Sequence, residues 1–324
     1  MKRSFASIFS ETVLKLTGNK RHFIQKKHFD KYMERVKKRH IYPYVLPSIF
    51  RKRSDFELHK VQDMDVYWIK GDGTNDKIKI LYLHGGGYTS DPLPFHWGYI
   101  LAMKMRTQTD FFVPIYPKLP FYTYKDAFPR MMEVYEYLLE KYNPEDIIFM
   151  GDSAGGGFVL ALAQLVHEKG MPQPRDIIML SPWLDITMTN PNMPEYEKVD
   201  PTLGIKGLAE TGKYWAGDTD PNHYLLSPIN GSLEGLGRMT LFAGTRELLC
   251  PDARKLKAIA DEQGIPLTYY EYQGMGHVFP FHPTPEAREA NDIIFNIIMN
   301  KEPCDGLTEN SLCELVRNQV SKKD

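Results

Sequence analysis

Ser153 lies in the sequence GDSAG, residues 151–155, which has the pattern G-x-S-x-G. An apolar stretch typical of a strand, DIIFMG, precedes it, and an apolar, alanine-rich stretch typical of a helix follows it. A sharp turn from strand to helix is the setting of a nucleophile elbow, in which the helix N-terminus stabilises negative charge. The pattern therefore predicts that Ser153 is the nucleophile of an acyl transfer, with an ordinary glycine-rich turn as the alternative.

A serine hydroxyl is a weak nucleophile unless a base removes its proton. Four histidines follow Ser153: His167, His223, His277 and His282. His277 lies in YQGMGHVFP, directly after the last predicted strand, and loops at the carboxyl ends of parallel strands line the ligand crevice. His167 falls within a predicted helix, His223 within an insertion, and His282 beyond the loop. We therefore expect His277 to be the general base.

The base needs an acid that orients the imidazole and stabilises its protonated form. The sequence GTRELLCPD, residues 244–252, follows a predicted strand and contains Glu247 and Asp252. Asp252 begins a predicted helix, where an acidic side chain stabilises the free N–H groups. Glu247 has no such structural role, so Glu247 is the predicted acid and Asp252 the alternative. Either residue gives the chain order Ser, acid, His.

A second glycine cluster, HGGG at residues 84–87, follows another predicted strand. Glycines let backbone N–H groups approach a tetrahedral intermediate without obstruction. We predict that Gly85, Gly86 and Ala154 donate their N–H groups to the oxyanion. Neither glycine cluster has the form of a phosphate-binding loop or of a dinucleotide fingerprint, and we expect neither a cofactor nor a metal.

The elements that must position these residues follow an α/β order. Residues 56–61 and 63–71 predict an antiparallel hairpin. Short apolar strands then alternate with helical stretches, which is typical of a mostly parallel sheet with helices on both faces. These strands are predicted at residues 77–83, 110–116, 146–151, 176–181, 239–244 and 267–272. A helix at 285–300 follows, with Thr284 as its N-cap.

Two regions lie outside this alternation. Helical spacing predicts two amphipathic N-terminal helices with basic outer faces, at 4–17 and 21–38, and prolines end the second one. The first has its apolar stripe at Phe5, Ile8, Phe9, Val13 and Leu16. About 60 residues separate two core strands near 181 and 239, more than one crossover needs. Within them, 188–204 predicts a loop and 203–217 a helix, whose Tyr214 and Trp215 could form cap core or line an acyl pocket.

We therefore expect a helical cap over a single core. The predicted domains are N-terminal cap helices at 1–55, a core at 56–185 and 226–302, a cap insertion at 186–225, and a polar C-terminal tail at 303–324.

The formal net charge of −1 conceals an uneven distribution. Residues 1–53 hold 15 Lys and Arg against 3 Asp and Glu. We expect a solvated helix face here, because no nucleic-acid motif accompanies the charge. No run of 18 apolar residues predicts a membrane span, and polar residues interrupt the only candidate signal peptide. Three cysteines without metal or disulfide spacing favour the cytoplasm. Membrane association and nucleic-acid binding are not expected, and a homodimer stays open.

These motifs together resemble the hormone-sensitive-lipase-like branch of the α/β-hydrolase family, of the bacterial acetyl-esterase type. The resemblance covers roughly residues 56–300 and implies the α/β-hydrolase fold, an ester-hydrolysing Ser–acid–His triad, no cofactor and a cap. Two features depart from the family: Glu247 stands where Asp is usual, and KLPFYTY carries aromatic residues where a glutamate often follows the proline. The resemblance rests on HGGGY (84–88), YPKLPFYTYKDAF (116–128), GDSAGG (151–156), SPWLD (181–185), YLLSPI (224–229) and GMGHVF (274–279).

The predicted function is a serine carboxylesterase that hydrolyses short-acyl esters, with a small-molecule ester as its partner. Three alternatives stay open at this point. The triad would also serve an amidase or peptidase, the basic helices would suit a lipase at a membrane surface, and the fold is also used by non-catalytic receptors.

Overall fold

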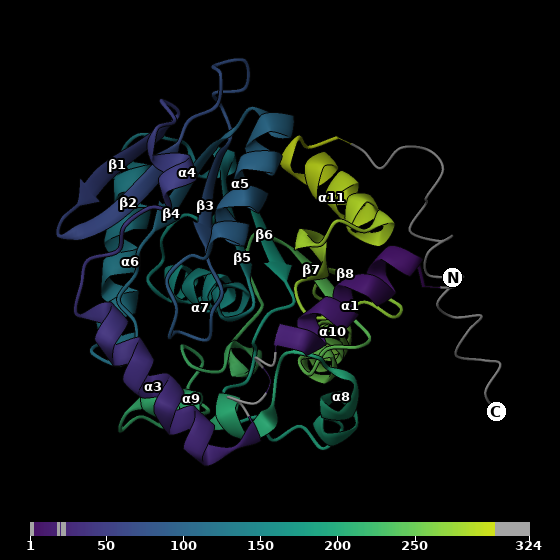
Figure 1. The fold of residues 1–324 in the computed structure, drawn as a ribbon. Helices are drawn as coiled ribbons and strands as arrows, with labels where there is room; N and C mark the ends of the chain where they lie inside the picture. Colours follow the sequence, from purple (N-terminus) through teal and green to yellow (C-terminus); the bar gives the residue numbers. More distant parts are fainter. Residues whose placement is uncertain (1–2, 18–19, 21–23, 302–324) are drawn as a thin grey trace.

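A computed structural model of the chain describes residues 3–17, 20 and 24–301. Its centre is an eight-stranded sheet in the order β1-β2-β4-β3-β5-β6-β7-β8 (Figure 1). The β1–β2 and β2–β4 pairs are antiparallel and the others parallel, so the predicted hairpin and the mostly parallel sheet are both confirmed. The strands are β1 (Phe56–Val61), β2 (Met64–Ile69), β3 (Lys79–Leu83), β4 (Asp110–Pro114), β5 (Ile147–Asp152), β6 (Asp176–Leu180), β7 (Arg238–Gly244) and β8 (Leu267–Tyr272).

Helices cover both faces of this sheet. Successive side chains of a strand point to opposite faces, and in β3 Leu81 and Leu83 join one buried cluster while Ile80 and Tyr82 join another. The first cluster includes side chains of α6 (Tyr124–Leu139), α7 (Ala154–Glu168) and α10 (Cys250–Glu262). The second includes side chains of α4 (Ser48–Arg51), α5 (Pro94–Thr107) and α11 (Pro285–Ile298).

The helix predicted after the sheet is confirmed as α11. The Thr284 side chain accepts a hydrogen bond from the Ala287 N–H at 3.1 Å, which caps the first turn as predicted. Ala290, Ile294 and Ile298 are fully buried against the sheet. Here the apolar periodicity identified both the helix and the face that it buries.

The insertion between β6 and β7 contains two helices, α8 (Met193–Val199) and α9 (Ile205–Ala216). The prediction of a helix is confirmed for α9, but the prediction of a loop at 188–204 is wrong over α8. Pro194 stands in the first turn of α8, where its missing N–H is harmless, so this proline starts a helix rather than breaking one.

The second N-terminal helix, α3 (Lys26–His40), agrees with its predicted orientation. Phe29 and Val36 are buried, whereas the basic side chains of Lys31, Arg35, Lys37, Lys38 and Arg39 are exposed. α3 passes in front of α9 in Figure 1, and the rings of Phe29 and Tyr214 stack at 6.3 Å. These contacts join the N-terminus to the insertion. The division into core and cap stays a prediction, and the tail at 303–324, with Cys304 and Cys313, lies outside the described residues.

The first N-terminal helix, α1 (Phe5–Thr17), has the opposite orientation to the one predicted. Phe5 is 92% exposed, Phe9 72%, Ile8 46% and Val13 45%, whereas Ser7 and Glu11 are buried. The prediction of a basic outer face is therefore wrong for α1. The reason is that a charged side chain on its polar face, Glu11, forms ion pairs with Arg246 of the core and with Arg3 and Lys15 of the N-terminal segment.

Candidate active site

The nucleophile elbow predicted at Ser153 is formed between β5 and α7. Ser153 has φ 53° and ψ −121°, a conformation that L-residues adopt only where the surrounding structure imposes it. Its N–H donates to the carbonyl of Leu180 on the neighbouring strand at 2.9 Å. A Cβ at Gly155 would lie 2.0 Å from the Leu83 carbonyl oxygen, so only glycine allows the helix to approach this closely. The local chain thus presents the serine hydroxyl at the tip of the turn.

The structure brings Ser153, His277 and Glu247 together. His277 Nε2 lies 2.9 Å from Ser153 Oγ, and His277 Nδ1 lies 2.7 Å from Glu247 Oε2. The other carboxylate oxygen of Glu247 accepts the Gly244 N–H at 2.8 Å. The three residues follow β5, β8 and β7, whose carboxyl ends meet at one edge of the sheet. A hydroxyl, an imidazole and a carboxylate in this order can transfer a proton away from the serine.

Burial and hydrogen bonding together set the pKa values of Glu247 and His277. Glu247 is fully buried, and this burial raises the pKa of its carboxyl group, although the hydrogen bond from His277 opposes the shift. Burial lowers the pKa of His277, but the hydrogen bond to Glu247 and its negative charge outweigh burial, and the net pKa lies above its usual value. Glu247 therefore stabilises the imidazolium that forms when His277 accepts a proton.

The alternative acid, Asp252, does not contact His277. Its Oδ1 accepts a hydrogen bond from Asn190 Nδ2 at 2.8 Å, and its Oδ2 is buried without a partner. Burial raises the pKa of Asp252 to about 6. Among the described residues, the other three candidate histidines form no hydrogen bond to Ser153, so His277 is the candidate that reaches this serine.

One of the predicted oxyanion donors, the Gly85 N–H, has an acceptor within the chain. The Gly85 N–H already donates to Asp152 Oδ1 at 3.0 Å in a buried setting, so it has no hydrogen left for an oxyanion. Within the described part of the chain, the N–H groups of Gly86, Gly87 and Ala154 donate to no backbone or side-chain acceptor. Of the predicted set, Gly86 and Ala154 thus have N–H groups open to an oxyanion, as does Gly87, whereas the Gly85 N–H is paired with Asp152.

Sequence reasoning missed three polar residues that support the relay. Asp152 holds the glycine loop through Gly85 and accepts a hydrogen bond from the Tyr82 hydroxyl at 2.6 Å. The Ser181 side chain acts to lower the pKa of Glu247 and accepts the Val278 N–H at 3.0 Å. Asp200, from the insertion, accepts the Leu248 N–H at 2.7 Å. Position was the only signal in the sequence, and it applied to two of them: Asp152 ends β5 and Ser181 directly follows β6.

Tyr88 connects the glycine loop to the helix of the elbow and to the insertion. Its hydroxyl donates to the Ala154 carbonyl at 3.1 Å, and its ring stacks on Trp215 of α9 at 4.3 Å with an angle of 4°. Trp215 is fully buried, whereas Tyr214 is 53% exposed. Trp215 therefore belongs to the packed interior, one of the two roles that the sequence allowed for it, whereas Tyr214 does not.

α3 also contacts this loop. The hydroxyls of Tyr32 and Thr89 lie 2.6 Å apart, and Thr89 Oγ1 donates to the Gly86 carbonyl at 2.9 Å. Helices from the N-terminus and from the insertion thus both support the loop that carries the oxyanion donors.

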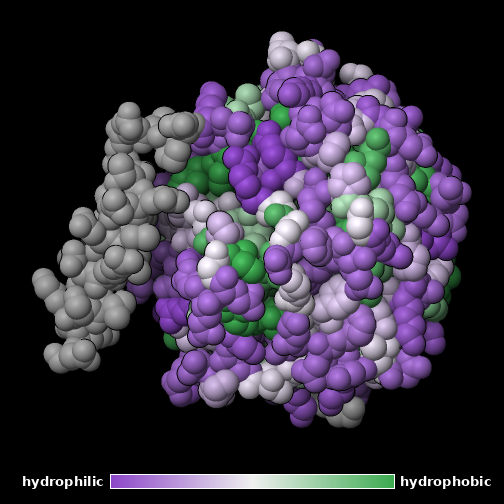
Figure 2. Space-filling view, turned by 180° about the vertical axis from the view of Figure 1, so that it is seen from behind, coloured by the Kyte–Doolittle hydropathy of each residue, from purple (hydrophilic) through white to green (hydrophobic). Residues whose placement is uncertain are grey.

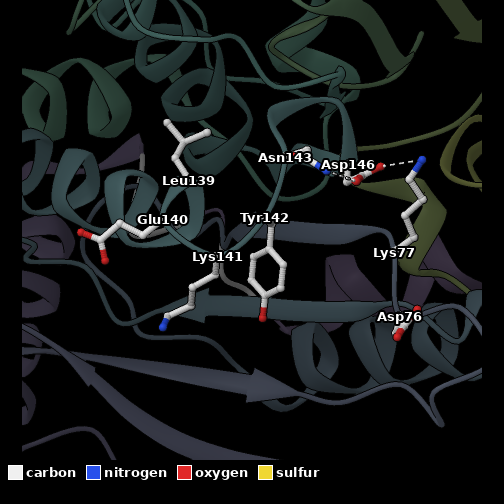
Figure 3. A pocket seen from close by; sticks show the side chains of 8 residues that line it. All are labelled: Asp76, Lys77, Leu139, Glu140, Lys141, Tyr142, Asn143 and Asp146. Atoms are coloured by element: carbon white, nitrogen blue, oxygen red, sulfur yellow. Dashed lines mark hydrogen bonds and ion pairs between the residues drawn. The ribbon is translucent and has the colours of Figure 1, made fainter.

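A groove of about 580 Å³ lies away from this site (Figure 3). It is lined by residues near the amino ends of β3 and β5, including Lys77 and Asp146, whose side chains pair at 3.3 Å. None of the triad residues lines it. Among the described residues, no group of three or more His, Cys, Asp or Glu side chains could hold a metal ion. The same residues include no helix with the length and apolar character needed to cross a bilayer.

Comparison with known proteins shows the family to which the chain belongs. The family model described as the alpha/beta hydrolase fold matches residues 80–281. An esterase from Acinetobacter venetianus is 30% identical over 215 residues, which cover 65% of this chain and 71% of that protein. An acetyl-hydrolase from Streptomyces hygroscopicus is 30% identical over 229 residues, which cover 70% of this chain and 76% of that protein. The chain therefore belongs to the α/β-hydrolase fold family.

Solved structures give the same result. An esterase/lipase from an uncultured bacterium has a TM-score of 0.78 and 25% identity, over 92% of this chain and 99% of that one. An esterase from the bacterial hormone-sensitive lipase family shares the fold, with a TM-score of 0.72 and 24% identity over 86% of this chain and 99% of that one. The predicted resemblance to esterases of this group and the predicted fold class are confirmed.

Proposed function

We propose that the chain is a serine carboxylesterase that hydrolyses short-acyl, acetyl-type esters, with Ser153 as nucleophile, His277 as base and Glu247 as acid. Ester hydrolysis as the class of reaction follows from the family and from relatives that are esterases and acetyl-hydrolases. The observation that carries the residue assignment is the relay from Ser153 Oγ to His277 at 2.9 Å and on to Glu247 at 2.7 Å.

The proposed reaction consists of two acyl transfers. Ser153 Oγ attacks the ester carbonyl carbon while His277 Nε2 takes the hydroxyl proton, and Glu247 stabilises the resulting imidazolium. The oxyanion accepts hydrogen bonds from the N–H groups of Gly86, Gly87 and Ala154. His277 then protonates the leaving alcohol, which departs and leaves the acyl group on Ser153. A water molecule, deprotonated by His277, releases the acid and restores the serine.

Two observations support a short acyl group. The site has little open surface, since the His277 side chain is 9% exposed. Beside the glycine loop, the buried ring of Tyr88 stacks on the buried rings of Trp183 and Trp215, so these three side chains are packed interior. The acetyl-hydrolase relative points the same way. A location in the cytoplasm stays a prediction from the cysteine content.

The test is the initial rate on p-nitrophenyl esters from acetate to palmitate, measured for wild type and Ser153→Ala together. We expect the fastest turnover with the shortest chains and none above background in the variant. A maximum at long chains would overturn the short-acyl assignment but leave Ser153 in place. Hydrolysis by Ser153→Ala at the wild-type rate would overturn the nucleophile itself.

A further inference from the structure

The exposed side of α1 is an apolar surface without a function in the fold. Phe5, Ile8, Phe9 and Val13, which we call the α1 face, are 45–92% exposed. Scattered exposed apolar residues are ordinary on a protein surface, but a row of them along one helix marks a site of interaction. An amphipathic helix that folds only to cover the core would turn this side inward, as α11 does.

Specific polar contacts hold the α1 face outward. The Ser4 N–H and hydroxyl donate to the two carboxylate oxygens of Glu286, each at 2.8 Å. Glu11 accepts hydrogen bonds from Arg246 at 3.0 and 2.9 Å. Burial raises the pKa of Glu11, but the hydrogen bonds from Arg246, Lys15 and Arg3 outweigh burial and lower it to about 2. The orientation is thus specified by paired polar groups directly before α1, at Ser4, and near its middle, at Glu11.

A strongly basic helix accompanies the α1 face. α3 has the sequence KKHFDKYMERVKKRH, with seven Lys and Arg against two Asp and Glu. Its basic side chains at Lys31, Arg35, Lys37, Lys38 and Arg39 are exposed. Figure 1 draws α1 in front of α10 and α3 in front of α9, so both helices lie on the near side of the molecule. Figure 2 shows the opposite side, where most residues are hydrophilic and hydrophobic areas are small.

We propose that α1 and α3 form a docking surface for a membrane that contains anionic lipid. The α1 face would enter the boundary between headgroups and acyl chains, and the basic side chains of α3 would contact the negatively charged headgroups. Helices with an apolar face bind at such interfaces when basic residues add electrostatic attraction. The sequence predicted no membrane association, because contact with water is enough to explain a basic helix. Contact with water does not explain the α1 face, whose apolar side chains are held toward solvent.

Charge favours a lipid surface over a second copy of the chain. A symmetric dimer formed through α1 would bring two positively charged surfaces toward each other, and like charges oppose such an approach. An anionic membrane supplies the opposite charge and an apolar layer together. The proposal concerns binding and not chemistry, so it can be tested with Ser153→Ala and does not depend on the proposed function.

The experiment is co-sedimentation of the full chain with vesicles of phosphatidylcholine alone or with about 30% phosphatidylglycerol, from about 0.05 M to about 0.5 M salt. We expect binding to the anionic vesicles that weakens as salt increases. Phe5→Ser/Phe9→Ser should reduce this binding at least about tenfold, because it removes the two most exposed apolar side chains of the helix. Lys37→Glu/Lys38→Glu should reduce binding to anionic vesicles and remove most of its salt dependence.

A matched control is Leu58→Ser/Met105→Ser, which changes apolar side chains on β1 and α5 that are 53% and 61% exposed. It should bind vesicles as wild type does. Circular dichroism should show all three variants folded, because every changed side chain is exposed. The proposal is overturned by wild type that ignores anionic vesicles at low salt, or by equal loss in the control. It is also overturned if sedimentation velocity shows a dimer that Phe5→Ser/Phe9→Ser dissociates while vesicle binding is absent.

Discussion

Glu247 and Asp252 are two buried carboxylates in adjoining segments, the loop after β7 and the first turn of α10, but only one of them reaches the histidine. Both oxygens of Glu247 accept hydrogen bonds, from His277 and from the Gly244 N–H. Asp252 has one donor, Asn190, and one oxygen without a partner. The difference shows that burial by itself does not place a carboxylate beside a histidine, and that the donors around each carboxylate help to set its charge.

Backbone hydrogen bonds on both sides of Glu247 explain why this residue, and not Asp252, reaches His277. On one side of it, the Arg246 N–H donates to the Met275 carbonyl at 2.8 Å, which ties the acid loop to the loop of His277. On the other side, the Leu248 N–H donates to Asp200 at 2.7 Å. Asp252 already belongs to α10, whose direction carries its side chain toward Asn190.

The largest loss of activity is expected when Ser153 is replaced, because either acid would act on this residue through His277. Ser153→Ala removes the nucleophile, and kcat should fall by about 10⁶. Single-turnover and steady-state rates on p-nitrophenyl acetate would measure the loss. A residual rate within about tenfold of wild type would mean that a group other than Ser153 attacks the ester, and neither Glu247 nor Asp252 would then be needed to activate Ser153.

Glu247→Gln and Asp252→Asn compare the two carboxylates directly. Glu247→Gln keeps the side-chain length but removes the charge beside His277, and kcat should fall by about 10⁴. Asp252→Asn changes a group without contact to the relay, and kcat should stay within about threefold of wild type. If the two effects were reversed, Asp252 would be the acid and the loop geometry would have to change in the working enzyme.

Asp252→Asn should instead change stability. Its folded pKa of about 6 lies above the ordinary 3.8, so the folded state prefers the protonated acid. That stabilisation is complete below about pH 4 and is lost as pH rises through about 6, at a cost of up to about 2–3 kcal/mol. Urea unfolding of Asp252→Asn should therefore show a gain over wild type at pH 8 that shrinks toward pH 4. An equal difference at both pH values would contradict this assignment.

The smallest expected effect is in the pH profile. His277 must be unprotonated to act as a base, and its pKa lies above the ordinary 6.5 because of Glu247. The acid limb of kcat/KM should therefore have its midpoint above pH 6.5 in wild type. Asp252→Asn should leave that midpoint in place. In Glu247→Gln, burial should lower the pKa of His277 without the opposing charge of Glu247, so the residual activity should persist to lower pH.

Helices α1 and α11 show how far periodicity carries a prediction. Both have apolar residues at helical spacing, and both were predicted as helices from that spacing. In α11 the apolar stripe is buried, as Ile294 and Ile298 show, whereas in α1 Phe5 and Phe9 face outward. Spacing determines that the side chains share one face, and it does not determine what that face meets.

The sequence by itself predicted the strands, the turn at Ser153 and His277 as its partner, because turn residues and strand patterns are local properties, and it favoured Glu247 over Asp252 as the acid. Tertiary structure alone decided three further points. The Gly85 N–H is taken by Asp152, Asp252 is directed to Asn190, and α1 is turned by Glu286 and Arg246. In each case the partner lies far along the chain, and a buried or paired polar group takes the nearest donor or acceptor that the fold supplies.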